Sequence, residues 1–125
     1  MSMKGVKQVL IPILDCYIYL VRDKASAREF LEAHAHDADP TVFDRAEGVC
    51  YVAVDEDGNH HRMMCVFAES TNAIVHESVH AAWMTLEHCG LKATARNHEM
   101  LAYTAAWLAD EMLDFKRPKR RRARP

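Results

Sequence analysis

No apolar run in this 125-residue chain is long enough to cross a membrane. The longest, VLIPILDCYIYLV, is interrupted or bounded by Pro12, Asp15, Arg22 and Asp23, and a membrane helix needs roughly 20 apolar residues. No small-residue cleavage site follows this run, although two lysines precede it. These absences predict a protein without a membrane helix and without a signal peptide.

Cysteine is also scarce, and its pattern excludes two kinds of site. The four cysteines, Cys16, Cys50, Cys65 and Cys89, form no C-x-x-C pair of the kind used by structural zinc and redox sites. Half of the residues are apolar or aromatic, so one domain of this length can bury its own core without cross-links. We therefore expect reduced, mostly buried thiols in a cytoplasmic protein.

Acidic residues are absent from the last ten positions, KRPKRRRARP, which carry seven Lys or Arg. The remainder holds nine basic residues against 18 acidic ones, which predicts an acidic domain over residues 1–115 and a basic tail over 116–125. The tail has no aromatic residue for base stacking, and its two prolines disfavour a helix. A disordered tail, a nucleic-acid contact and docking onto the acidic body all remain open.

The first half of the chain predicts strands with one helix between them. Residues 8–21 are rich in Val, Ile, Leu and Tyr, as in a buried strand, and residues 24–35 have helical spacing. HDADP then ends the helix, because Pro40 disfavours helical geometry before it. GVCYVAV and HRMMCVFA flank DEDGNH, whose Asp-Gly pair indicates a β-hairpin.

The second half predicts two helices. Residues 71–89 begin at a capping Ser70 or Thr71, end at Gly90, and carry an apolar stripe of Ile74, Val75, Val79, Ala82, Trp83 and Leu86. A last helix over 97–115 directs Leu101, Ala105, Leu108, Met112 and Phe115 inward. The predicted order is β-α-β-β-α-α, an α+β domain with a small three-stranded sheet.

The central helix contains the motif His76-Glu77-Ser78-Val79-His80. Histidines four residues apart on a helix project from one side and can bind one metal ion. The glutamate between them can reach a metal-bound water, as in H-E-x-x-H zinc hydrolases. The alternative is an amphipathic helix whose polar edge happens to carry these residues.

A catalytic zinc takes a third protein ligand, and ARNHEMLAY offers two candidates at the start of the last helix. We favour Glu99, because Ala102, Tyr103 and Ala106 continue its side of the helix and small residues permit close approach. His98 points about 100° away. Tyr103 can stabilise an oxyanion, or it is a packed helix tyrosine.

His76-Glu77-x-x-His80, followed after 19 residues by a helical Glu99 in HEMLAY, resembles the gluzincin class of zinc metallopeptidases, in particular minigluzincins. It also resembles small metallopeptidases predicted in phages and prophages. The resemblance covers residues 60–112. It implies a zincin-like sheet whose outer strand, here HRMMCVFA, lies beside the H-E-x-x-H helix and binds an extended peptide.

The leading hypothesis is a zinc-dependent metallopeptidase of phage origin, with His76, His80 and Glu99 as Zn²⁺ ligands, Glu77 as general base and Tyr103 as a further catalytic residue. Under this hypothesis the protein acts on a peptide or protein substrate. The alternative is a zinc-stabilised accessory protein that catalyses nothing and binds nucleic acid or a protein through the tail 116–125. A third reading is a metal-free interaction module.

Overall fold

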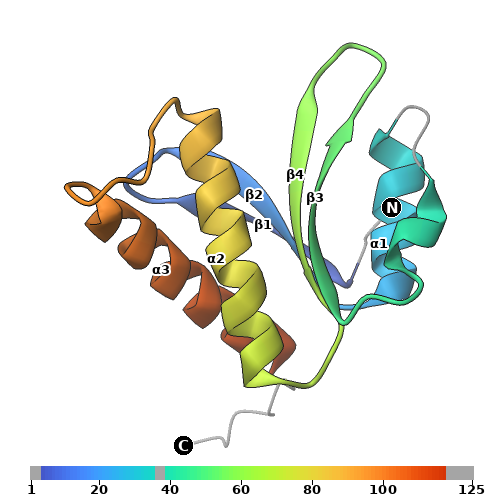
Figure 1. The fold of residues 1–125 in the computed structure, drawn as a ribbon. Coiled ribbons are helices and arrows are strands. Elements are labelled where there is room, and N and C mark those ends of the chain that lie inside the picture. Colours follow the sequence, from blue (N-terminus) through green and yellow to red (C-terminus); the bar gives the residue numbers. More distant parts are fainter. Residues whose placement is uncertain (1–3, 36–38, 118–125) are drawn as a thin grey trace, which may run out of the picture.

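The computed structural model of the protein describes residues 4–35 and 39–117. In chain order their secondary structure elements are β1 (Val6–Ile11), β2 (Cys16–Val21), α1 (Lys24–His34), the short 3-10 helix η1 (Pro40–Phe43), β3 (Gly48–Val54), β4 (His60–Val66), α2 (Thr71–His88) and α3 (His98–Lys116). The strands form one sheet in the order β1-β2-β4-β3. Helices α2 and α3 cover one face of this sheet, and α1 covers the other (Figure 1). The predicted α+β class is confirmed.

The sheet has one strand more than predicted, because the apolar run 8–21 forms an antiparallel hairpin rather than a single strand. The register places Ile11 opposite Cys16, and residues 12–15 make the turn between them. Proline at position 12 cannot donate a ladder hydrogen bond, and Asp15 adopts a left-handed conformation with φ 52°, which Asp tolerates better than bulky residues do. The expected three-stranded sheet is therefore wrong, and the sheet has four strands.

The predicted β3–β4 hairpin is confirmed, but the expected outer strand is not. The two strands pair antiparallel around a turn in which Gly58 has φ +83°. On its other side, β4 pairs parallel with β2, with Tyr19 opposite Met63. HRMMCVFA thus supplies an inner strand, and β3 is the edge. The reason is burial: Arg62 to Val66 are buried on both faces of the sheet.

Helix α2 begins and ends where the sequence indicated. The Ser70 side chain accepts a hydrogen bond from the Ala73 amide at the first turn, and Gly90 follows the last turn with φ +75°. The apolar stripe is only partly right. Ile74, Ala82 and Leu86 are buried, but Val75, Val79 and Trp83 are 51, 43 and 46% exposed. The packed side of α2 is instead formed by Ile74, Glu77, Ser78, Ala81, Ala82, Thr85 and Leu86.

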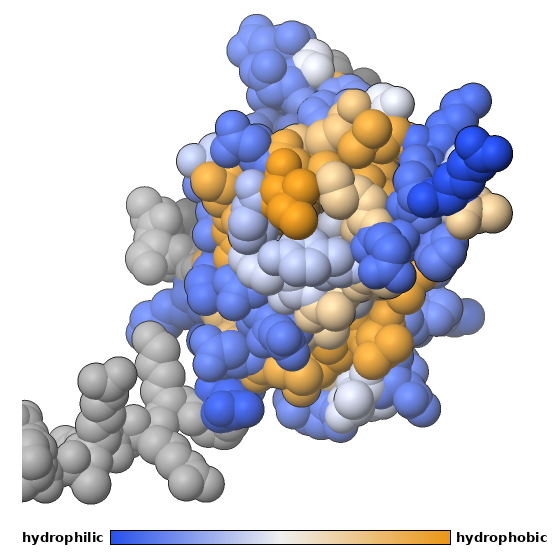
Figure 2. All heavy atoms as spheres, turned by 90° about the vertical axis from the view of Figure 1, so that its left-hand side faces the viewer, coloured by the Kyte–Doolittle hydropathy of each residue, from blue (hydrophilic) through white to orange (hydrophobic). Residues whose placement is uncertain are grey.

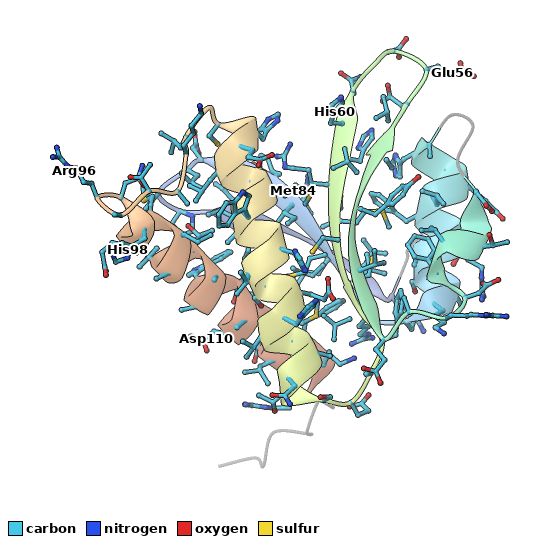
Figure 3. The ribbon with its side chains drawn as sticks, in the orientation of Figure 1. Glu56, His60, Met84, Arg96, His98 and Asp110 are labelled. Carbon is cyan, nitrogen blue, oxygen red and sulfur yellow. The ribbon has the colours of Figure 1, made fainter. Side chains whose placement is uncertain are left out.

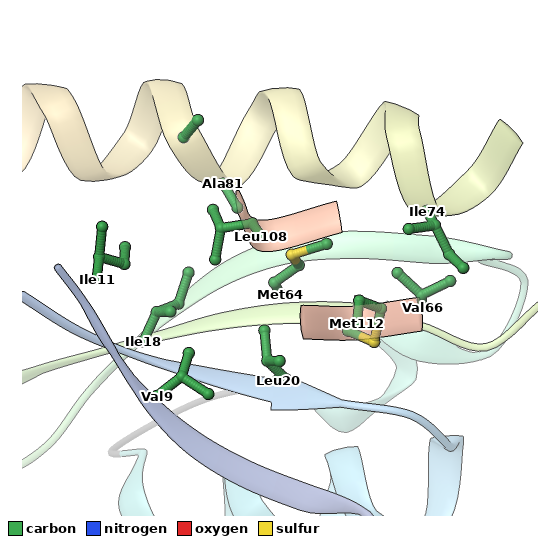
Figure 4. Close-up of a cluster of buried hydrophobic side chains, with 11 residues drawn as sticks. Val9, Ile11, Ile18, Leu20, Met64, Val66, Ile74, Ala81, Leu108 and Met112 are labelled. Carbon is green, nitrogen blue, oxygen red and sulfur yellow. The ribbon is translucent and has the colours of Figure 1, made fainter. Parts of the chain in front are cut away.

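Two apolar cores lie on the two faces of the sheet. Alternation along β2 and β4 sends Ile18, Leu20, Met64 and Val66 toward α2 and α3, where Ile74, Ala81, Leu108 and Met112 meet them (Figure 4). Val21, Met63 and Cys65 point the opposite way, onto Phe30, Leu31 and Phe43. Burial on both faces explains why the sheet, although mixed, is rich in continuous apolar sequence.

Helix α3 returns antiparallel to α2 (Figure 1). Leu108 and Met112 are fully buried, while Leu101, Ala105 and Phe115 pack at the edge of the core as predicted. The helix extends to Lys116, one residue beyond the predicted domain boundary, and the Lys116 ammonium donates a 2.9 Å hydrogen bond to the Val66 carbonyl. The side of the molecule that lies at the left in Figure 1 shows alternating apolar and polar patches on its surface (Figure 2). The basic positions 118–125 lie outside the described residues.

The helices found in the described part of the chain include none that combines the length and apolar character of a membrane span. The four cysteines are free thiols. Cys65 is buried, and Cys16, Cys50 and Cys89 are partly buried, so burial is less complete than predicted; that the thiols are reduced in the cell stays a prediction.

Replacing Leu108 by Ala tests the core on the helical side of the sheet. Leu108 is fully buried, so we expect the free energy of unfolding to fall by about 2–5 kcal/mol. The matched control is Leu113→Ala in the same helix, where the side chain is 38% exposed and the loss should stay below about 1 kcal/mol. Urea unfolding measures both, and equal losses would contradict the described packing of α3.

Candidate functional site

Helix α2 presents His76 and His80 side by side on its exposed surface. The two Nε2 atoms are 3.1 Å apart, and the His76 side chain is 67% exposed. Two nitrogens bound to one tetrahedral zinc at about 2.0–2.1 Å are separated by about 3.3 Å. The pair therefore has the spacing of two ligands on one zinc ion without further movement of the helix.

Glu77 lies between these histidines in sequence but points toward the sheet. It is 6% exposed, and its Oε2 is 3.8 Å from His76 Nε2. Within residues 4–35 and 39–117, that imidazole is the only basic nitrogen within 4.0 Å of the carboxylate. A carboxylate in so dry a position is unfavourable unless another group compensates its charge. The carboxylate thus lies at the edge of the apolar core, and the His76 imidazole beside it is on the solvent side.

The edge strand makes room for this carboxylate by starting with glycine. A Cβ atom at Gly48 would lie 2.8 Å from Glu77 Cγ and 2.8 Å from the Cys65 carbonyl oxygen. The conformation of Gly48 is one that other residues can adopt, because its φ is not positive. Space, rather than backbone geometry, is therefore the reason for glycine at this position.

Two adjoining hollows between α2 and β3 contain the three motif residues. Gly48, His76 and Glu77 line both; Glu47, Asn72 and Ala73 complete one, and Val49, Cys50, His80 and Met84 complete the other, which has a volume of about 410 Å³. Gly48, Val49 and Cys50 belong to β3, the edge strand of the sheet, and an edge strand has one row of backbone groups without a strand partner.

Two thiols near Glu77 hold their protons at neutral pH in the metal-free protein. Burial, and after it the charge of Glu77, raises the pKa of both the Cys50 and the Cys65 thiols far above the usual range. Cys50 instead donates a 3.2 Å hydrogen bond to the Glu77 carbonyl. The Cys50 thiol thus links β3 to the main chain of α2, while His76 and His80 offer exposed imidazole nitrogens beside it.

The structure does not bring Glu99 to the histidine pair. The Lys116 bond to Val66, just before α2, shows that α3 ends beside the beginning of α2, so its first turn, with Glu99, lies near the end of α2. Met84 projects from α2 toward the strands, whereas His98 lies on the opposite side of α2 (Figure 3). Among residues 4–35 and 39–117, no three His, Cys, Asp or Glu side chains are grouped closely enough to hold a metal. The ligand role of Glu99 stays a prediction.

Tyr103 is likewise separate from the motif. Its side chain is 47% exposed on α3, and it lines neither of the two hollows that contain the histidines. His98 and Glu99 are also exposed. The sequence therefore predicted that the motif residues of α2 lie together. It did not predict where Glu99 and Tyr103 on α3 lie relative to them.

Sequence reasoning missed the residues that β3 contributes. Gly48 and Cys50 pack directly against Glu77, and Met84 borders the same hollow. Glycine at the start of a predicted strand was the available signal, because it marks a place where another group comes close. Nothing in the local sequence distinguished Cys50 from a core thiol.

No protein-family model, no curated protein and no solved structure matches this chain.

Gly48→Ala tests the close contact between β3 and Glu77. We expect the added methyl group to lower the free energy of unfolding by about 1–3 kcal/mol, as overpacking does. In a Glu77→Ala background the same change should cost at least about 0.5 kcal/mol less, because one of its two clashes is gone. Urea unfolding of the four proteins gives this difference, and an identical cost in both backgrounds would contradict the described contact.

Proposed function

We propose that this protein is a zinc-dependent hydrolase of peptide bonds, with His76 and His80 binding the metal and Glu77 as general base. The observation that supports the proposal most strongly is the joint geometry of the three side chains. The imidazole nitrogens are 3.1 Å apart and exposed, while the adjacent carboxylate is 6% exposed and 3.8 Å from one of them. Bound zinc would activate a water molecule and polarise a carbonyl group.

The exposure of the histidines favours a catalytic site over a structural one. Structural zinc sites are closed by four protein ligands, whereas catalytic sites keep a position open to solvent. Here the pair borders an open hollow, and the described residues supply no closed cage. A zincin-like arrangement, with the helix beside an edge strand, belongs to the same proposal.

The residues beside the hollow have distinct parts in the proposed reaction. Glu77 accepts a proton from water and delivers it to the leaving amine, because its carboxylate faces the histidine side of the hollow. The outer edge of β3 binds the substrate backbone in extended form through main-chain hydrogen bonds. Gly48 fixes where the carboxylate can lie. The substrate class is therefore an unfolded or extended peptide segment.

Zinc titration of the protein without a histidine tag tests the metal site. We expect wild type to bind about one zinc per chain. His76→Ala or His80→Ala should weaken zinc binding more than about 100-fold, because losing a ligand costs more affinity than losing a residue that hydrogen-bonds to a ligand, which costs about 10–100-fold. Calorimetry after chelator treatment measures the affinity. The matched control is His98→Ala, an exposed histidine on α3, which should bind zinc like wild type.

Glu99→Ala in the same titration decides the identity of the third ligand. On the described geometry, where Glu99 is not grouped with the histidines, we expect affinity close to wild type and water in the remaining positions. A loss as large as that of His80→Ala would instead establish the three-ligand site predicted from sequence.

Glu77→Gln separates a hydrolase from a zinc-stabilised accessory protein. Glutamine preserves the shape of the side chain but accepts no proton, so peptide hydrolysis should fall by about 10²–10⁴-fold while zinc affinity is retained. Cleavage of a fluorogenic peptide mixture, followed by mass spectrometry, measures the rate. Hydrolysis unchanged in Glu77→Gln, or absent from zinc-loaded wild type, would favour the accessory role through the tail 116–125.

A further inference from the structure

Two of the four cysteines meet across the fold. Cys16 is the first residue of β2, and Cys89 is the capping residue at the C-terminal end of α2. They are 73 positions apart in the sequence, yet their Sγ atoms lie 3.0 Å from each other. A disulfide bond is about 2.05 Å long, so the two sulfurs would have to approach by only about 1 Å to form one.

The main chain on both sides brings these sulfurs together. Cys16 directly follows Asp15, whose φ of 52° belongs to the turn between β1 and β2. The Cys89 amide donates a 3.0 Å hydrogen bond to the Thr85 carbonyl, and Gly90 after it has φ +75°. Both cysteines are thus placed by the ends of regular elements, and rotation of their side chains can shorten the distance between the sulfurs.

The other two cysteines are placed differently. Cys50 donates a 3.2 Å hydrogen bond to the Glu77 carbonyl and packs against the core under α2, whereas Cys65 is fully buried in the core on the α1 face. Their side chains therefore point to opposite faces of the sheet, which excludes a disulfide between them. The Cys89 thiol is also much less deeply buried than either of these two thiols.

We propose that Cys16 and Cys89 form a reversible redox-modification site, which a small-molecule disulfide such as glutathione disulfide oxidises to an intramolecular disulfide. The 3.0 Å contact between the sulfurs supports this proposal most directly, together with the partial exposure of both residues. The new bond would join the end of α2 to the start of β2. The site includes none of the proposed zinc ligands and does not depend on the hydrolase proposal.

The oxidation takes place by two thiol–disulfide exchanges. First, the thiolate of one cysteine attacks a sulfur of glutathione disulfide, so that a protein–glutathione disulfide forms and one glutathione leaves as its thiolate. The thiolate of the other cysteine then attacks the protein sulfur of this mixed disulfide and displaces the second glutathione. Two electrons pass from the protein to the oxidant, and the two thiol protons are taken up by the departing glutathione thiolates.

The contact between the sulfurs and their protonation affect the rate in opposite directions. The second exchange is intramolecular, and proximity of the reacting groups favours it over attack by a free thiol from solution. Burial, followed by the hydrogen bond with Cys16, raises the pKa of Cys89 to about 11, and the thiolate is the reactive form. We therefore expect complete oxidation by glutathione disulfide to take on the order of hours.

The disulfide would close a loop that contains most of the fold. The segment between Cys16 and Cys89 includes α1, β3 and β4 and nearly all of β2 and α2, whereas β1 and α3 lie outside it. A cross-link over so long a segment restricts the unfolded chain and thereby stabilises the folded one. We expect oxidation to raise the urea concentration at the midpoint of unfolding by about 1 M.

The test is mass spectrometry of the metal-free, full-length protein after incubation with glutathione disulfide. We expect a monomer that has lost two hydrogen atoms and, after digestion, a pair of peptides linked through Cys16 and Cys89. Cys50 and Cys65 should react with an alkylating agent once the oxidised protein is unfolded. The urea midpoint should rise by about 1 M, and dithiothreitol should restore its original value.

Serine variants connect these results to the two residues. Cys16→Ser and Cys89→Ser should each stop at a glutathione adduct on the remaining cysteine of the pair, without a rise in the urea midpoint. The matched control is Cys50→Ser, whose hydroxyl group can still donate to the Glu77 carbonyl, and it should form the cross-link as wild type does.

Four results with wild type would overturn the proposed site: no reaction, glutathione adducts without a cross-link, a cross-link through Cys50 or Cys65, or a disulfide between two chains. A Cys16–Cys89 cross-link that left the urea midpoint unchanged would overturn the proposed stabilisation.

Discussion

The contact between Glu77 and the first residue of β3 is the constraint on which the candidate site depends. The Glu77 side chain occupies space that Gly48 leaves open: the residue is 6% exposed, and a Cβ atom at position 48 would lie 2.8 Å from Glu77 Cγ and 3.3 Å from its carboxylate carbon. This close approach fixes the rotation of α2 about its axis relative to the sheet. Once that rotation is set, His76 and His80 face solvent beside the edge strand, and Ile74, Ala81 and Ala82 face the core.

The same packing explains which chemistry the helix can perform. Residues one position apart on a helix point about 100° apart, so Glu77 can be nearly buried while His76 is exposed, and the two still approach within 3.8 Å. The Glu77 side chain packs against Gly48, and the Cys50 thiol donates to the main-chain carbonyl of Glu77, whereas the imidazoles remain accessible. A rigid base beside accessible metal donors is the arrangement that the proposed hydrolysis needs.

Much of the fold and part of the site could be predicted from the sequence, and the failures have physical causes. Ser70 and Gly90 set the limits of α2 through local capping, so that helix was predicted closely. The β1–β2 turn was hidden in an apolar run, because Ile13 and Leu14 lie within the turn itself between Pro12 and Asp15. The side of α2 on which α3 packs is decided by long-range contacts of Leu108 and Met112, and spacing along the sequence therefore could not place Glu99.

X-ray absorption at the zinc edge, on protein loaded with one zinc per chain, tests the central claim most directly. The account predicts a first shell of nitrogen and oxygen at about 2.0–2.1 Å, the outer-shell pattern of two imidazoles, and no sulfur at about 2.3 Å. That pattern should disappear in His76→Ala. A sulfur shell would show that Cys50 or another thiol binds the metal, and a spectrum without imidazole would contradict the site built on α2.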